Sequence, residues 1–288
     1  MKKVLLFGMS GNPPTGRDGH TGMVEYFVSL ARFDEIWVLP VYKHMFLSKR
    51  DAMAEVGAPT FEDRIEMCRL SFERYSTVGC SVKVLRTEQE VFTNALTARG
   101  SGNTAAPTRT CTYDVVQHLQ ERHPEAQARC ILFFSLLLGT DTYQDLRNGR
   151  WRNSEGLMRM VSLVVVDRLG VRGETENLLA GVETHHPPML TDVSSTKIRK
   201  ASARELVGGT LAVEYQVLQY MREKRLYGFG RQSRLDRALM EAAERFSTPW
   251  WIAAGAAVLI VAVGVGTAAA AARRRGGGRI SAAGFAVS

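Results

Sequence analysis

Short apolar runs alternate with amphipathic stretches along the first 230 residues. Runs of strand length occupy residues 4–10, 35–41, 81–85, 131–138 and 161–167, and helical spacing occupies residues 24–31, 61–75 and 113–122. The runs 131–138 and 161–167 are almost continuously apolar, as strands buried on both faces of a sheet are. We therefore expect an α/β fold, a Rossmann-like parallel sheet with helices on both faces. Residues 99–110, rich in Gly, Ser, Thr and Pro, predict a loop.

The C-terminal segment has a different pattern. Residues 252–272 contain no charged side chain, and as a helix they would span roughly 31 Å, close to the hydrocarbon thickness of a bilayer. Trp250 and Trp251 precede this segment and Arg273 follows it, as interfacial aromatic and basic flanks do. Since no polar face is visible, we expect a transmembrane helix over residues 250–272. An Ala-rich helix buried against the domain, or a flexible tail, is the alternative.

These patterns divide the chain into four parts. We expect an α/β domain over residues 1–230, an amphipathic linker helix over 231–249, the transmembrane helix over 250–272 and a basic tail over 273–288.

Charge and cysteine content narrow the functional classes. The 288 residues include 37 Lys and Arg against 29 Asp and Glu, a net charge of +8. Four of the arginines lie in the last sixteen residues, so 33 basic residues remain against 29 acidic ones, a surplus of +4. Bulk charge therefore does not favour nucleic-acid binding. The four cysteines show no Cys-x-x-Cys spacing, which favours reduced thiols over a zinc site or a disulfide scaffold.

A glycine-rich segment, Gly8–His20, joins the first predicted strand to the first predicted helix. Backbone N–H groups and the helix dipole at such a junction favour an anion, and glycines let a phosphate approach the backbone. The segment has neither the Gly-Lys-Ser/Thr of a P-loop nor the spacing of G-x-G-x-x-G. A tight corner without a ligand has the same pattern, so this segment alone does not define a site.

A second segment, Val193–Lys200, predicts a helix start capped by hydroxyl side chains and ending near Gly208 and Gly209. The first turn of that helix would carry three cations, Lys197, Arg199 and Lys200. The helix dipole disfavours cations there, so an anion bound among them is the favoured interpretation. Cations that point to solvent are the alternative.

Both segments resemble one family. The first resembles the Gly-x-Ser-Phe-Asn-Pro-Pro-His-x-Gly-His signature of nicotinamide/nicotinate mononucleotide adenylyltransferases, and the second resembles their Ile-Ser-Ser-Thr-x-Ile-Arg signature. Further matching segments are Gly139-Thr140-Asp141 with Trp151 downstream, Thr112-Tyr113, Val164–Gly170 and Val217–Tyr227. The resemblance covers residues 1 to about 228 and implies that residues 1–230 form a nucleotidyltransferase domain.

The first motif departs from the family pattern. Gly11 stands where the family has Phe, and the stretch from Pro14 to Gly19 is longer than usual. The first His of the family signature therefore has no counterpart, and Thr15 or Arg17 occupies its place. The later His20 is retained.

The resemblance implies ATP-dependent adenylyl transfer to nicotinamide or nicotinate mononucleotide, with Mg2+ arriving with ATP and no dedicated metal site. It implies His20 and Arg199 as catalytic residues and Trp151 as a stacking platform for the pyridine ring. The implied nucleotide-binding residues are Gly8, Met9, Ser10, Arg17, Gly19, His20, Lys43, Gly139, Asp141, Ser194, Ser195, Thr196 and Arg199. Lys49 is an alternative to Lys43.

Less specific interpretations stay open. Trp151 is equally compatible with a core or lid aromatic, Asp141 with a helix cap, and the stretch from His185 to Pro188 predicts a loop. Another nucleotidyltransferase of the superfamily, cytidylyl or pantetheine-phosphate adenylyl transfer, is an alternative function. A non-catalytic, membrane-tethered nucleotide-binding protein is a further one.

The expected partners are ATP, a pyridine mononucleotide and, through residues 250–272, a lipid bilayer; nucleic acid is not expected. A C-terminal anchor would leave the catalytic domain cytosolic, on the mitochondrial outer membrane or the endoplasmic reticulum. The sequence leaves open the choice of membrane, the acid or amide form of the substrate and whether the chain forms a homo-oligomer.

Overall fold

The computed structural model describes most of the predicted α/β domain. The described residues are 2–43, 58–100, 110–124, 132–167, 179–201 and 213–231. All of them belong to the first of two compact units, Met1–Ser233; the second is Arg234–Ser288. Among the described residues, no helix combines the length and apolarity that a membrane crossing needs. Residues 232–288, which hold nearly all of the predicted linker helix and all of the predicted transmembrane helix and tail, lie outside that part.

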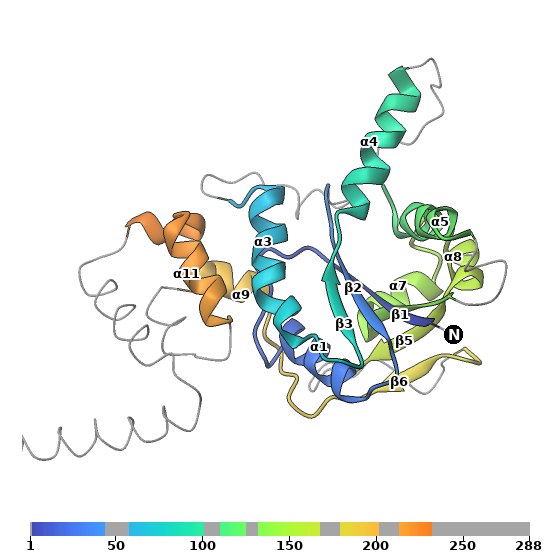
Figure 1. The fold of residues 1–288 in the computed structure, drawn as a ribbon, viewed down its shortest axis with the longest axis horizontal. Coiled ribbons are helices and arrows are strands. Elements are labelled where there is room, and N and C mark those ends of the chain that lie inside the picture. The colour runs from blue at the N-terminus through green and yellow to red at the C-terminus, as the bar shows by residue number, and fades with distance from the viewer. Residues whose placement is uncertain are drawn as a thin grey trace, which may run out of the picture. The chain divides into compact units, whose positions relative to one another are not determined.

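A parallel sheet forms the centre of the domain (Figure 1). Its strands are β1 (Lys2–Met9), β2 (Glu35–Pro40), β3 (Ser81–Val84), β4 (Leu132–Gly139), β5 (Ser162–Val166) and β6 (Glu183–His185), in the order β3-β2-β1-β4-β5-β6. The central strand β1 pairs in parallel with both β2 and β4, so that Leu6 lies between Trp37 and Leu136. The strand order reverses between β1 and β4, where ligands bind in open α/β sheets. The predicted Rossmann-like parallel sheet is confirmed.

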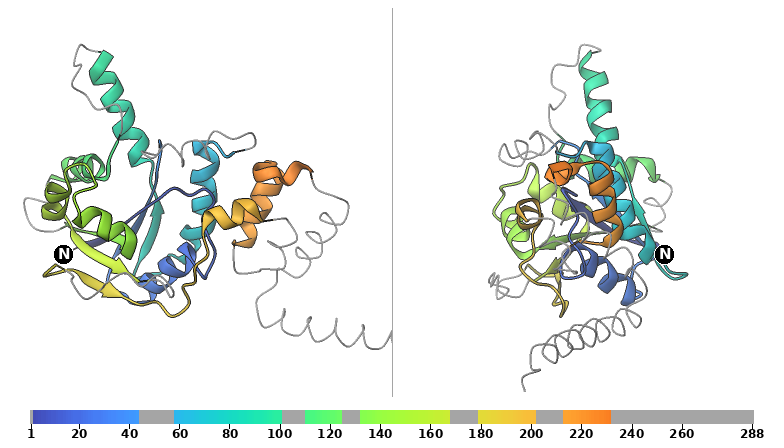
Figure 2. Two further views of the ribbon diagram at one scale, coloured as in Figure 1. Left: turned by 180° about the vertical axis from the view of Figure 1, so that it is seen from behind. Right: turned by 90° about the vertical axis from the view of Figure 1, so that its left-hand side faces the viewer.

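Helices cover both faces of this sheet (Figures 1 and 2). The helices are α1 (His20–Ser29) and α3 (Phe61–Phe72) on one face, and α5 (Thr112–Arg122), α7 (Thr140–Arg147) and α8 (Ser154–Met160) on the other. Side chains of β1 alternate between the two cores: Leu5 joins Phe27 and Phe72, whereas Leu6 joins Tyr143 and Leu146. This alternation follows from the two-residue period of a strand and explains why β1 is apolar on both sides.

Some elements differ from the sequence-based expectation. Helix α4 (Thr87–Gly100), which extends away from the sheet, and the short edge strand β6 were not predicted (Figure 1). The predicted loop over 99–110 therefore starts inside a helix, and its residues 101–109 lie outside the described part. The prediction that His185 belongs to a loop is wrong, because His185 ends β6 beside β5. The predicted helix over 61–75 is α3 followed by a 3-10 turn, η1 (Glu73–Tyr75).

Three short elements complete the described chain: α9 (Ser195–Lys200), α11 (Tyr215–Glu223) and the 3-10 helix η3 (Leu226–Arg231). Helix α11 packs on α3 and η3. The buried side chains Val217, Leu218 and Met221 lie on one side of α11, at the spacing of an amphipathic helix.

Candidate active site

A cavity of about 430 Å3 opens at the carboxyl ends of β1 and β4. Its lining includes eight of the residues proposed from the sequence: Gly8, Met9, Ser10, His20, Lys43, Gly139, Asp141 and Trp151. A Cβ atom built on Gly8 or on Gly139 would meet no atom within 4 Å. A ligand can therefore approach the backbone at both glycines, as the binding of a phosphate or nucleotide requires.

Two glycines give the turn after β1 its shape. Gly11 has φ +61°, and a Cβ at Gly11 would lie 2.8 Å from the Cys68 sulfur. A Cβ at Gly19 would lie 2.1 Å from Thr15 Oγ1. The family signature has Phe at the position of Gly11. The positive φ of Gly11 and the close approach of Cys68 would each exclude a Phe side chain here, so Gly11 is part of how the lengthened turn packs.

His20 opens α1 and is held by Thr15. The Thr15 backbone N–H donates to His20 Nδ1 at 3.0 Å, Thr15 Oγ1 lies 2.8 Å from the same nitrogen, and the His20 N–H donates to Thr15 Oγ1 at 2.7 Å. A backbone N–H can only donate, so Nδ1 is the acceptor and the neutral ring carries its proton on Nε2. The imidazole is thereby fixed as an Nε2–H donor in a cavity-lining side chain.

Thr15 and Arg17, the two candidates for the place of the missing family His, have different surroundings. Thr15 is buried at 1% exposure and contacts His20. Arg17 is exposed, pairs with Glu25 at 2.9 Å and is absent from the cavity lining. A hydrogen bond with Tyr75 is the largest cause of the raised pKa of Arg17. Thr15 is thus the residue that lies beside the catalytic His candidate.

The second motif packs against the first. Ser194 caps α9 by accepting from the Lys197 N–H, Ser195 Oγ donates to Pro13 O at 2.8 Å, and Arg199 Nη1 donates to Asn12 O at 2.7 Å. These contacts join segments more than 180 residues apart in the sequence. Ser194, Ser195, Thr196 and Arg199, like Gly19, lie outside the cavity lining. Ser195 and Arg199 hold the turn that contributes to it.

The prediction that Lys197, Arg199 and Lys200 all lie in the first turn of a longer helix is wrong. Helix α9 ends at Lys200, well before the predicted end near Gly208, so Lys197, Arg199 and Lys200 lie in its last turn. The dipole favours cations at that end. Lys197 also pairs with Asp192. The three cations therefore need no bound anion to offset an unfavourable dipole.

The wall formed by β4, α7 and the loop before α8 holds the other predicted residues. Gly139 ends β4 and is the N-cap of α7, Asp141 lies exposed in the first turn, and partly buried Trp151 packs against the core beneath it. Asp141 is therefore not the N-cap of α7, which was the alternative interpretation of this residue. Arg152, next to Trp151, donates to Cys111 Sγ at 3.2 Å and pairs with Asp114.

Several residues that line the cavity were not predicted from the sequence. Glu88 lines the cavity from α4, Thr110 and Cys111 from just before α5, and Arg150 and Arg152 from either side of Trp151. The flanking arginines could have been found by their position beside the predicted stacking residue, whereas α4 lacks the apolar stripe that would have marked Glu88 as inward-facing. Lys43 lines the cavity with its ammonium 4.3 Å from the Phe92 ring; Lys49 lies outside the described residues.

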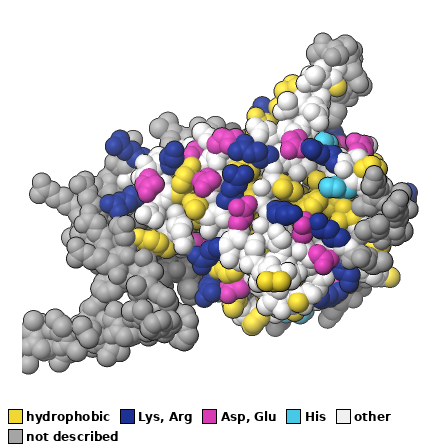
Figure 3. All heavy atoms as spheres, in the orientation of Figure 1, with side chains coloured by type: hydrophobic (Ala, Val, Ile, Leu, Met, Phe, Trp, Pro, Cys, Tyr) yellow, Lys and Arg dark blue, Asp and Glu magenta, His cyan; other side chains and the backbone are white. Residues whose placement is uncertain are grey.

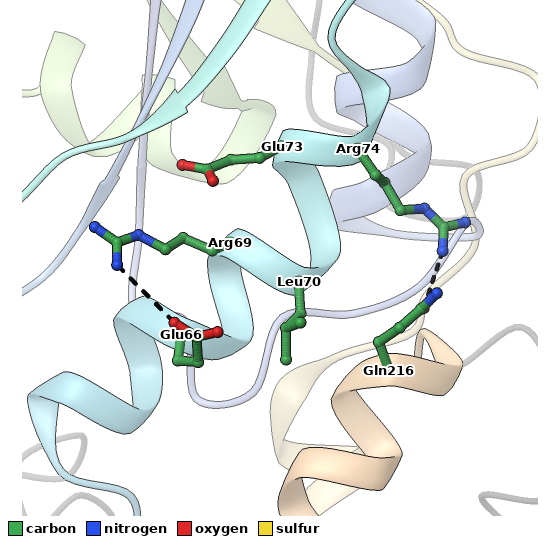
Figure 4. A pocket seen from close by; sticks show the side chains of 6 residues that line it. All are labelled: Glu66, Arg69, Leu70, Glu73, Arg74 and Gln216. Carbon is green, nitrogen blue, oxygen red and sulfur yellow. Dashed lines mark hydrogen bonds and ion pairs between the residues drawn. The ribbon is translucent and has the colours of Figure 1, made fainter.

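A second depression, of about 620 Å3, lies between α3 and α11 (Figure 4). Its side chains pair with one another: Arg69 with Glu66 at 3.9 Å and Arg74 with Gln216 at 3.0 Å. Charged side chains of both signs are interspersed over this face of the molecule (Figure 3). None of the predicted site residues lines it, so the chemistry is assigned to the cavity at β1 and β4.

The strand order and a glycine-lined cavity at the point where it reverses define an α/β nucleotide-binding protein. No protein-family model matches the chain. The chain is 30% identical over 232 residues to a probable nicotinate-nucleotide adenylyltransferase of Anaeromyxobacter dehalogenans, a match that covers 78% of this chain and 97% of the relative. The corresponding protein of Myxococcus xanthus is 29% identical over 229 residues, 80% of this chain and 96% of the relative.

A solved structure shares the fold. The Plasmodium falciparum nicotinic acid mononucleotide adenylyltransferase, complexed with NaAD, superposes with a TM-score of 0.57 at 17% identity, over 81% of this chain and all of that chain. On the strength of the curated relatives, the chain belongs to the nicotinate-nucleotide adenylyltransferase family and is a nucleotidyltransferase.

Proposed function

We propose that this protein catalyses adenylyl transfer from ATP to nicotinate mononucleotide, which yields the dinucleotide NaAD and pyrophosphate. The observation that carries this proposal is the cavity itself. Glycine backbone and the fixed Nε2–H donor of His20 line one part of it, and an aromatic side chain, Trp151, lines another. Phosphates and a planar base are the ligands that such groups recognise.

The reaction needs orientation and charge stabilisation and no covalent intermediate. A phosphate oxygen of the mononucleotide attacks the α-phosphorus of ATP, a new P–O bond forms, and the bond to the bridging oxygen breaks as pyrophosphate leaves. His20 would donate from Nε2 to an oxygen of the α-phosphate, and the backbone of Gly8, Met9 and Ser10 would approach the triphosphate. Lys43 adds a positive charge to the same cavity. Mg2+ enters as part of the substrate, MgATP.

Arg199 and the hydroxyls of α9 have an indirect task in this proposal. Ser195 and Arg199 donate to the carbonyls of Pro13 and Asn12, and Tyr227 donates to Asn12 Oδ1 at 2.6 Å. These bonds hold the turn whose backbone faces the nucleotide. Arg17 and Gly19 support the same turn from outside the cavity.

At the pyridine end, Trp151 would stack on the ring, and Asp141 would accept hydrogen bonds from a nucleotide hydroxyl. The acid form of the substrate is proposed because the curated relatives are named for nicotinate nucleotide. Purified protein should convert MgATP and nicotinate mononucleotide to NaAD and pyrophosphate faster than it uses nicotinamide mononucleotide. Preference for CTP, or turnover with pantetheine phosphate alone, would support the alternative transferases. Nucleotide binding without turnover would support the non-catalytic alternative.

We also propose, from the sequence, that residues 250–272 anchor the chain in a bilayer with its catalytic domain cytosolic. The uncharged 21-residue stretch 252–272 and its Trp and Arg flanks support this. Full-length protein should stay in the membrane pellet after washing with alkaline carbonate, and a chain ending at Thr248 should be soluble and active. Release of the full-length protein by carbonate, or loss of activity on truncation, would favour a helix packed on the domain.

A further inference from the structure

Arg64 is a buried arginine that contacts two segments leading into the cavity. It lies on α3, is 3% exposed, and is absent from the cavity lining. Its Nη1 donates to Ser10 O at 2.7 Å and to Val41 O at 2.5 Å, and its Nη2 donates to Tyr42 O at 3.1 Å. Ser10 follows β1 and Val41 follows β2. One guanidinium therefore connects the chain ends of two neighbouring strands.

This arrangement is costly for folding alone. Burial lowers the pKa of Arg64, and within the described residues its Nε has no hydrogen-bond partner and no carboxylate lies within ion-pair distance of its guanidinium. Its guanidinium carbon also lies 5.2 Å from the centroid of the Phe61 ring. A buried cation without a directly paired carboxylate loses hydration for limited return, and an apolar side chain is often at least as stabilising in such a position. The contacts of Arg64 therefore point to a role in the site that those carbonyls shape.

Glu88 holds the same segment from α4. Its Oε2 accepts from the Tyr42 N–H at 2.9 Å, so Tyr42 is bound through its carbonyl by Arg64 and through its N–H by Glu88. The Tyr42 ring packs edge-on against Phe61, with centroids 4.9 Å apart, and against Phe92. The next residue is Lys43, which, like Glu88, lines the cavity.

We propose that Arg64 is a positioning residue for adenylyl transfer, which with Glu88 fixes the spacing between the phosphate-binding turn at Ser10 and the segment that carries Lys43. The inference rests on the proposed function for its reaction and on the hydrogen bonds of Arg64 and Glu88 for its geometry. Arg64 acts through backbone carbonyls, so its loss should affect ATP, whose phosphates meet both segments. The mononucleotide should be affected less, because Arg64 donates to three carbonyls, none of which belongs to the wall that holds Trp151.

The test compares Arg64→Lys with Ile65→Ala. Lysine keeps the charge but lacks the planar fork that reaches three carbonyls. Ile65, next to Arg64 on α3 and 1% exposed, packs in the core, and its apolar side chain forms no hydrogen bond with either segment. Arg64→Lys should lower kcat/KM for ATP about 10²-fold, since small displacements of reacting groups cost that much, with little change in KM for the mononucleotide. Ile65→Ala should lower Tm and leave the KM values of both substrates unchanged.

Hydrogen–deuterium exchange supplies a readout independent of turnover. In Arg64→Lys, backbone exchange should rise in residues 8–16 and 41–43 and stay unchanged in α7. Equal effects of Arg64→Lys and Ile65→Ala on kcat/KM and on exchange would overturn the proposal. If Arg64→Lys does not fold, Glu88→Ala decides: it should raise exchange at 41–43 and raise KM for ATP, and no change in either would overturn the proposal. If the wild-type protein transfers no adenylyl group, the proposed function fails, and the exchange data still decide whether Arg64 holds the two segments.

Discussion

Arg64 and Arg199 donate to carbonyls two residues apart in the same turn: Arg64 Nη1 to Ser10 O and Arg199 Nη1 to Asn12 O, each at 2.7 Å. The two arginines come from α3 and α9, and neither lines the cavity. The turn between β1 and α1 is therefore bound by two cations through its backbone. Such bonds fix where its N–H groups point, which is the form of preorganisation that stabilises charge in a transition state.

His20→Ala should lower kcat by roughly 10²-fold or more, because removing one preorganised donor to a developing oxyanion costs that much. Steady-state rates with MgATP and nicotinate mononucleotide measure this. Thr15→Val is the informative companion, because it removes the hydroxyl that binds Nδ1 but leaves the ring; it should lower kcat by a smaller factor. A wild-type rate in His20→Ala would show that His20 does not contact the reacting phosphate.

Arg199→Ala should lower Tm and shrink the ATP-induced rise in Tm. The substitution leaves the carbonyl of buried Asn12 without its donor, a loss of about 1–3 kcal/mol, or several degrees in a domain of this size. Differential scanning fluorimetry with and without ATP measures both effects. Lys200→Ala, an exposed change on the same helix, is the control and should alter neither. An ATP-induced rise in Tm that is unchanged in Arg199→Ala would show that Arg199 does not contribute to nucleotide binding.

The sheet and the residues that line the cavity could be predicted from the sequence more accurately than the helix of the second motif. The strands other than β6 could be predicted because a parallel sheet buries both faces and so leaves near-continuous apolar runs. Gly8 and Gly139 were found because each follows such a run. The end of α9 was predicted wrongly, because it depends on where the chain turns after Lys200, which local composition did not show. Arg64 was missed because a single arginine among the polar residues of α3 resembles a solvated one until tertiary packing is known.

Trp151→Ala should raise KM for the mononucleotide more than KM for ATP, because stacking is offered to the pyridine ring. Trp151→Phe keeps an aromatic face and should restore part of the loss. Initial rates over a grid of both substrate concentrations separate the two KM values. Equal increases for both substrates would assign Trp151 to packing against the core cluster it borders.

The raised pKa of Glu88 predicts that the stability of the protein depends on pH. Loss of hydration raises its pKa from an ordinary 4.5 to about 7, so the folded state favours the protonated form. The protonated Glu88 carboxyl makes its full contribution to the free energy of unfolding below pH 4.5, and this contribution is lost as the pH rises through 7. Glu88→Gln, which mimics the protonated form, should match the wild-type Tm near pH 4 and exceed it near pH 8. Thermal denaturation at both values tests this; a difference in Tm that is the same at both would contradict the raised pKa.

The central claim is that this cavity transfers the α-phosphoryl group of ATP with its adenosine. The most direct measurement follows ATP labelled at the α-phosphate in the presence of Mg2+ and nicotinate mononucleotide. The account predicts that the label appears in NaAD, that unlabelled pyrophosphate forms in equal amount, and that both products are reduced together in His20→Ala. Label that stays in ATP, or that is released as AMP without dinucleotide, would contradict it.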